Sequence, residues 1–164
     1  MIVSKSAPVF GGVYKLVAVQ TDNEIEPKIK ISENTEKITI PGYKRLYRLY
    51  DNEENRAIAD LVANYDEVID GNSDVTIYHQ SNMWKFKKLQ KGTYHVKELQ
   101  VPIYDNGKLV YEMPTIEEIR AYSKEAQEEM WDEIYRLEYP HLYYVDLTKK
   151  LLDKKMELLE KNRR

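Results

Sequence analysis

The sequence predicts an α+β domain in which a small antiparallel β-barrel or sandwich of short strands is followed by two amphipathic helices. Short runs rich in β-branched and aromatic residues recur through the first two thirds of the chain, with turn signals between them. From Met113 onward, the apolar residues recur at helical spacing instead. The 164 residues are enough for one domain with a buried core, in which we expect the β-rich and helical parts to pack together. We divide the chain into a strand segment at 1–50, a β-rich part at 51–112 and a helical part at 113–164.

The first strands are expected on either side of a polar loop. Residues 9–19, VFGGVYKLVAV, combine a glycine pair with an alternating apolar run, which predicts a strand entered through a turn. The polar residues 20–26 are expected to form a hairpin loop, and Lys28–Ile31 a second strand. At Ser32 the alternation breaks, and 33–37 is expected to form one helical turn that the Ser32 hydroxyl caps.

Further strands are predicted up to residue 111. Pro41-Gly42 marks a turn before the strand-like run YKRLYRLY at 43–50. Residues 56–65 fit either a short helix or a strand. Residues 75–78, 83–89 and 94–103 predict further strands, and Asn106-Gly107 predicts a hairpin that pairs 101–104 with 108–111.

Two helices are expected in the last third of the chain. Thr115, with Glu118 three residues later, is typical of a capping box, and apolar residues follow at helical spacing from Ile116 to Leu137. This pattern predicts one long amphipathic helix that ends before Pro140. Asp146 is expected to cap a second helix that runs through Leu159.

The charges are distributed unevenly along the chain. It has 25 basic and 28 acidic side chains; residues 1–50 hold 8 and 5 of them, which leaves 17 and 23 for the rest. The net charge is therefore +3 for residues 1–50 and −6 for the rest of the chain. This pattern argues against general nucleic-acid binding and fits a small polyanion bound in one place.

Several classes of site and location are disfavoured by composition. The absence of cysteine excludes disulfides, thiolate nucleophiles and Cys-ligated zinc. No apolar run approaches the roughly 20 residues of a membrane span, and no signal peptide is recognisable, so we expect a cytoplasmic protein without membrane contact.

The sequence offers no catalytic or metal-binding constellation. His79, His95 and His141 are far apart and lack metal-ligand spacing. The common phosphate-loop, dinucleotide, nucleophile-elbow and zinc-protease motifs are missing from the sequence. We therefore assign no catalytic residue and no metal ligand.

The basic stretch, which we define as Pro27–Tyr50, is the best candidate for a binding site. It contains six basic residues against Glu33 and Glu36, namely Lys28, Lys30, Lys37, Lys44, Arg45 and Arg48. A local excess of positive charge in an acidic protein suggests an anionic ligand. The alternative is a solvated pair of strands in which lysine and arginine protect an exposed edge.

Four blocks of the sequence resemble the C-terminal part of bacterial nicotinate phosphoribosyltransferase. In order, they are GGVYKLVAV, PKIKISENTEKITIPGYKRLYRLYD, ELQVPIYDNGKLVYEMPTIEEIRAY and WDEIYRLEYPHLYYVDL. Enzymes of that family make nicotinate mononucleotide from nicotinate and phosphoribosyl pyrophosphate with hydrolysis of ATP, in NAD biosynthesis. Their catalytic groups lie on an α/β barrel upstream of the matching blocks. The resemblance therefore implies that residues 1–164 are a C-terminal domain or fragment that is inactive alone.

The resemblance also implies phosphate contacts and partners. In related enzymes, basic residues that follow the phosphate loop approach the phosphates, and the matching positions here are Lys5, Lys30, Ser32, Lys37 and Lys44. The implied partners are the rest of the parent enzyme, a second subunit, and weakly bound phosphoribosyl pyrophosphate or pyrophosphate. ATP and Mg²⁺ would belong to the parent enzyme, so no cofactor is expected in this chain. The alternative is a stand-alone, non-catalytic β-rich module with a protein partner at its tyrosine-rich surface.

Overall fold

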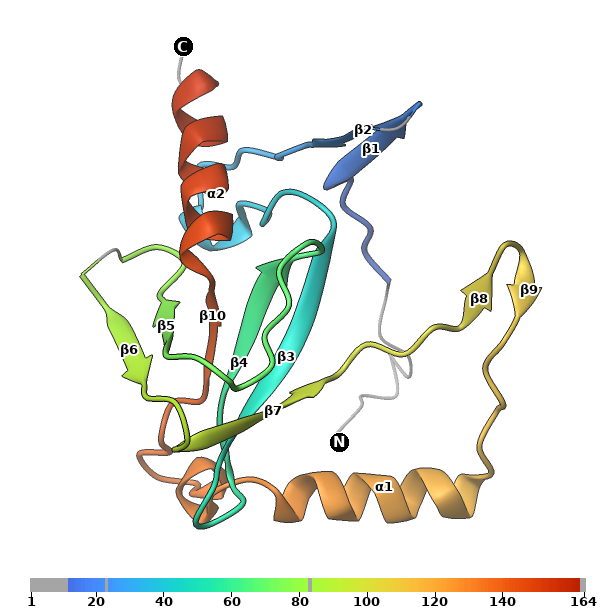
Figure 1. Ribbon diagram of the computed structural model, residues 1–164, viewed down its shortest axis with the longest axis vertical. Helices are drawn as coiled ribbons and strands as arrows, with labels where there is room; N and C mark the ends of the chain where they lie inside the picture. The colour runs from blue at the N-terminus through green and yellow to red at the C-terminus, as the bar shows by residue number, and fades with distance from the viewer. Residues whose placement is uncertain (1–11, 23, 83, 163–164) are drawn as a thin grey trace.

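The computed structural model describes residues 12–22, 24–82 and 84–162 (Figure 1). Its strands and helices follow in chain order: β1 (Ala18–Thr21), β2 (Glu24–Pro27), the 3₁₀ turn η1 (Thr35–Lys37), β3 (Lys44–Asp51), β4 (Ala57–Asn64), β5 (Val75–Tyr78), β6 (Phe86–Leu89), β7 (Tyr94–Glu98), β8 (Tyr104–Asp105), β9 (Lys108–Leu109), α1 (Ile116–Glu128), the 3₁₀ turn η2 (Asp132–Tyr135), β10 (Tyr144–Leu147) and α2 (Lys149–Lys161). Among these residues, no helix is long and apolar enough to cross a bilayer.

A curled, six-stranded sheet forms the body of the protein, with the strand order β6-β5-β10-β4-β3-β7 (Figure 1). The α+β class and the two helices are confirmed, but the sheet is mixed where the sequence predicted an antiparallel one. The exception is β10, which runs parallel to β4 with Tyr144 opposite Ala59. The chain between β4 and β10 passes through β5 to β9 and α1, and parallel pairing needs a long connection of this kind.

One face of the sheet carries the larger core. Alternate residues of β3 and β4, including Tyr47, Leu49 and Leu61, are buried there and pack with Ile77 and Tyr94. The loop between β4 and β5 covers this face, because the hydroxyl groups of Tyr47 and Tyr94 donate to backbone oxygens of that loop at 2.9 and 2.7 Å. Ile69 of the same loop also packs against this core, so the loop is part of it.

Helix α2 covers the opposite face and builds a second core from Leu147, Leu151 and Leu152. The predicted N-cap, Asp146, is wrong. The N-cap of α2 is Thr148, whose side-chain oxygen accepts a hydrogen bond from the Leu151 amide. The sequence did not predict the strand β10, whose pairing with β4 continues until the Thr148 amide donates to the Val62 backbone oxygen at 3.0 Å. Asp146 is thus a strand residue.

Several predicted boundaries also differ. Residues 56–65, which fitted helix or strand, contain the central strand β4. The second strand of the first hairpin is β2, so the strand predicted at Lys28–Ile31 is wrong. The Asn106-Gly107 hairpin is confirmed but pairs only two residues on each side. The Thr115–Glu118 capping box is confirmed as well, yet α1 ends at Glu128 instead of before Pro140.

Candidate docking site

The segment that we call the arm, residues 99–142, projects from the sheet as the small β8–β9 hairpin followed by α1 (Figure 1). Helix α1 is amphipathic but has no buried residue. Ile116, Ile119 and Tyr122 follow at three-residue spacing on one side of this helix and are 52–65% exposed. Other large apolar side chains of the arm are exposed too, including Val101, Ile103, Tyr104, Leu109, Val110, Met113, Tyr135, Leu137, Tyr139 and Leu142. Many exposed apolar side chains on one segment are typical of an interaction site.

A polar cluster holds the C-terminal end of α1 against the sheet. The Tyr50 hydroxyl donates to the Glu129 carboxylate at 2.6 Å, and the Lys97 ammonium lies 3.3 Å from its other oxygen. Burial by itself would raise the pKa of Glu129, but these two hydrogen bonds outweigh burial and lower it. The Ala57 amide donates to the Glu129 backbone oxygen at 2.8 Å, and the Arg56 guanidinium donates to the Glu128 backbone oxygen at 2.7 Å. The helix therefore ends at a fixed position.

A second polar cluster holds the returning end of the arm. Arg48 of β3 donates to both oxygens of Asp60 in β4, at 2.8 and 3.0 Å. The Tyr143 hydroxyl donates to the same carboxylate at 2.7 Å, and its ring centroid lies 5.8 Å from the Arg48 guanidinium carbon. The hydrogen bonds with Asp60 raise the pKa of Arg48, and burial raises the pKa of Tyr143. We call Arg48, Tyr50, Asp60, Glu129 and Tyr143 together the polar anchor.

The polar anchor has the properties of a structural device. Its carboxylates accept from neighbouring tyrosine, lysine and arginine donors, and no buried side-chain polar atom lacks a partner among the described residues. It fixes the C-terminal end of α1 and the residue that follows the arm, and it leaves the apolar side chains of the arm uncovered. This arrangement suits docking onto another surface.

The structure separates the predicted phosphate contacts. Lys5 lies outside the described residues. The Lys44 ammonium donates to the backbone oxygens of Ile40 and Gly42, at 2.8 and 2.5 Å, and so stabilises the turn before β3. Burial lowers the pKa of Lys44.

The other predicted contacts lie together near η1. Lys30 and Lys37 are exposed, Ser32 is half-buried, and neither lysine forms an ion pair with another described residue. The Lys30 amide donates to the Thr39 hydroxyl at 2.9 Å, which brings Lys30 back towards the end of η1. Of the basic stretch, Lys30 and Lys37 therefore remain available to an anion.

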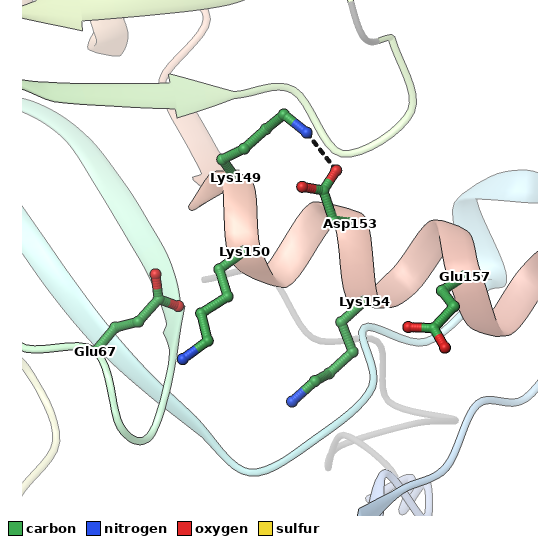
Figure 2. A pocket seen from close by; sticks show the side chains of 6 residues that line it. All are labelled: Glu67, Lys149, Lys150, Asp153, Lys154 and Glu157. Carbon is green, nitrogen blue, oxygen red and sulfur yellow. Dashed lines mark hydrogen bonds and ion pairs between the residues drawn. The ribbon is translucent and has the colours of Figure 1, made fainter.

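A groove of about 730 Å³ at the start of α2 is lined by charged side chains, namely Glu67, Lys149, Lys150, Asp153, Lys154 and Glu157 (Figure 2). Lys149 pairs with Asp153 along the helix (Figure 2), and Lys150 lies 2.6 Å from Asp66. Glu67 accepts from the Asn64 amide and from the Thr148 hydroxyl, which joins the groove to the helix cap. The charges are thus balanced locally, and the groove has no excess positive charge for an anion.

Sequence reasoning did not predict that the arm would stand alone. The apolar stripe of α1 was expected to pack on the β-rich part, as the stripe of α2 does. Nothing in the residue pattern distinguishes an amphipathic helix that packs on its own domain from one that packs on a partner. The exposure of α1 appears only once the structure shows that both faces of the sheet are covered by other segments.

Comparisons with known proteins agree with these observations. Residues 43–155 match the sequence family described as the nicotinate phosphoribosyltransferase C-terminal domain. Nicotinate phosphoribosyltransferase of Bacillus subtilis is 32% identical over 96% of this chain and 32% of its own length. The enzyme of the same name from Dictyostelium discoideum is 27% identical over 93% of this chain and 26% of its own length.

The fold is shared with the crystal structure of human nicotinic acid phosphoribosyltransferase. The TM-score is 0.67 at 20% sequence identity, with 91% of this chain and 27% of the human chain covered. The chain thus spans between a quarter and a third of the length of these relatives.

Proposed function

Because the chain belongs to the nicotinate phosphoribosyltransferase C-terminal domain family, we propose that it is the docking domain of such an enzyme. The sheet supplies a stable base, and the arm lies along the rest of the enzyme, which makes nicotinate mononucleotide. The observation that carries the proposal is the exposed apolar face of an arm whose C-terminal part is fixed to the sheet by the polar anchor.

Two arguments identify the occupant of the arm. A helix of 13 residues such as α1 is marginal in water by itself, so it needs a surface to pack on. The chain also spans only 32% of the Bacillus subtilis relative, so about two thirds of that protein has no counterpart here. The surface that completes α1 belongs, in this proposal, to that larger part.

The chain alone is expected to be inactive. Among the described residues, no group of three or more acidic or histidine side chains is placed to hold a metal ion. In the assembled enzyme, Lys30 and Lys37 serve as accessory phosphate contacts, with Ser32 between them, in a site that a second subunit completes. Lys44 suits this role least because backbone oxygens already bind its ammonium group.

Titration with pyrophosphate tests the phosphate contacts. The backbone amide signals at 30–37 are expected to shift at about millimolar ligand in NMR spectra, whereas those of the charge-balanced groove at 149–157 are expected to stay in place. Equal shifts in both regions would indicate non-specific binding and would contradict the assignment.

Association in trans tests the docking role. The Bacillus subtilis relative, shortened by its matching C-terminal third, is mixed with this chain, and binding is followed by calorimetry and by formation of nicotinate mononucleotide. We expect binding by the wild type and by Glu117→Ser, which changes the polar side of α1. Ile119→Ser, in the apolar stripe, should bind at least about tenfold more weakly, the effect of losing one buried aliphatic contact.

The relative's own C-terminal third is the positive control. If that fragment binds and this chain does not, or if Ile119→Ser binds as tightly as Glu117→Ser, the docking proposal is wrong. The stand-alone interaction module would then be the better explanation. Steady-state product formation by the isolated chain would contradict the proposed inactivity.

A further inference from the structure

A second groove, of about 500 Å³, lies between η1 and the C-terminal half of α2. Its walls are mainly apolar, with neutral hydrogen-bonding groups beside them; the lining residues are Ile31, Thr35, Ile38, Gln80, Ser81, Lys155, Met156, Leu159, Glu160 and Asn162. The lining has two charged residues, Lys155, which is buried, and Glu160, which is exposed, so the basic group alone lies inside the groove. It has the size and the apolar lining of a small-molecule site.

Lys155 is the unusual residue of this groove. It is only 3% exposed, and its ammonium donates to the Gln80 backbone oxygen at 3.1 Å. An ammonium group has three donors, and among the described residues no carboxylate forms an ion pair with this one. Burial lowers the pKa of Lys155, with no nearby acid opposing the effect.

The buried carboxylate of Asp146 does not neutralise Lys155. Asp146 of β10 is 8% exposed; burial raises its pKa, while His79 and a hydrogen bond from the Gln80 backbone oppose that rise. The Gln80 backbone contacts both groups, since its amide donates to Asp146 and its carbonyl oxygen accepts from Lys155. Glu160 lies at the exposed rim of the groove.

A buried ammonium group with one neutral acceptor is costly for a fold to keep. A bound anion would supply the missing charge and accept the remaining donors. The walls formed by Ile31, Ile38 and Leu159 favour an apolar body on that anion, because they would otherwise face water. A single lysine matches one negative charge, and Glu160 at the rim disfavours a ligand that carries a second.

We propose that this groove binds a small monocarboxylate with an apolar body, whose carboxylate accepts from the Lys155 ammonium and whose chain or ring lies between η1 and α2. The site is independent of the docking role and uses none of the residues of the arm or the polar anchor.

Calorimetric titration of the intact chain with hexanoate and with benzoate tests this site. We expect saturable binding of both at about millimolar concentration or below, and binding at least about tenfold weaker for hexanol and for hexylamine, which lack the negative charge. Amide shifts in NMR spectra should concentrate at 31–38, 80–81 and 155–159.

The variant Lys155→Met removes the charge and keeps the length of the side chain, so it should fold and lose at least about tenfold in affinity for hexanoate. Lys149→Met removes a charge from the exposed side of the same helix and should bind as the wild type does. Ile38→Gln keeps all charges and should weaken hexanoate more than acetate. The proposal is overturned if neither carboxylate saturates at about 10 mM, if Lys155→Met binds as tightly as the wild type, or if hexanol competes equally with hexanoate.

Discussion

Substituting Asp60 by asparagine tests whether the polar anchor stabilises the domain. Asp60 is 7% exposed and accepts two hydrogen bonds from Arg48 and one from Tyr143. Asp60→Asn keeps the shape but removes the negative charge, which leaves the Arg48 guanidinium unpaired in a side chain that is only 16% exposed. Breaking a buried pair from one side costs about 3–5 kcal/mol, and the partial exposure of Arg48 puts this case near the lower end, at about 3 kcal/mol.

Urea unfolding followed by circular dichroism measures the effect. With a slope of about 2 kcal/mol per M, the expected loss moves the unfolding midpoint down by roughly 1.5 M. Tyr143→Phe removes one hydrogen bond to the same carboxylate and should cost about 1.5 kcal/mol. Asp153→Asn, whose partner Lys149 is exposed on α2, is the matched control and should cost less than about 0.5 kcal/mol.

A double substitution separates the pair from its parts. Arg48→Met with Asp60→Leu replaces both charges by apolar groups, and the double variant should lie within about 1.5 kcal/mol of the wild type, because no charge is left buried alone. The reasoning is refuted if Asp60→Asn costs less than about 1 kcal/mol, or if the double variant costs as much as the two single changes added together.

Three further predictions concern Asp146, Glu129 and Gly42. Asp146→Asn should raise the free energy of unfolding at neutral pH, because burial raises the pKa of Asp146 and so disfavours its charged form in the fold. This gain in stability should disappear below the unfolded-state pKa of about 3.9. Urea unfolding at several pH values measures both effects. Glu129 has a lowered pKa in the fold, so its ionised side chain stabilises the fold above an unfolded-state pKa of about 4.3. This stabilisation is lost as the pH falls through the pKa of the folded state. The melting temperatures of wild type and Glu129→Gln should therefore converge in acid, and a constant difference would contradict this. Gly42→Ala should lower the free energy of unfolding by about 1–2 kcal/mol, as thermal unfolding can show, because Gly42 has a φ of +88° that alanine adopts only with strain. The added Cβ would not clash, since its nearest neighbours lie 3.9 Å away. A neutral result would mean that the turn relaxes.

The parts of the fold with local signals could be predicted from the sequence. The strands at 44–51, 75–78 and 86–89 follow β-branched and aromatic runs between turns, and the Asn106-Gly107 hairpin and the Thr115–Glu118 capping box depend on neighbours within a few residues. Elements whose limits depend on distant contacts could not. The apolar spacing of α1 continues to Leu137, but its end at Glu128 is set by partners in β3 and β4.

The candidate sites show the same division. Composition identified the basic stretch, but it could not show that Arg48 forms an ion pair with Asp60. Nor could it show that the Lys44 ammonium donates to backbone oxygens of the adjacent turn. Lys155 was missed although the sequence contained a signal for it. The residue lies four positions after Leu151 and three after Leu152, and so falls within the apolar stripe of α2. A lysine at such a position predicts either a buried charge or a binding site.

The position of β10 affects the order in which this protein can fold. In the sheet, the pair β6–β5 is joined to β4, β3 and β7 only through β10. Without β10, the pair β6–β5 would be joined to the rest of the sheet only by side-chain packing, through Ile77 in the shared core. During synthesis, the six strands therefore form one hydrogen-bonded sheet only after residue 147 has emerged, and the same pairing places the end of the arm. The last strand to be made is thus the one that couples the stability of the sheet to the placement of the arm.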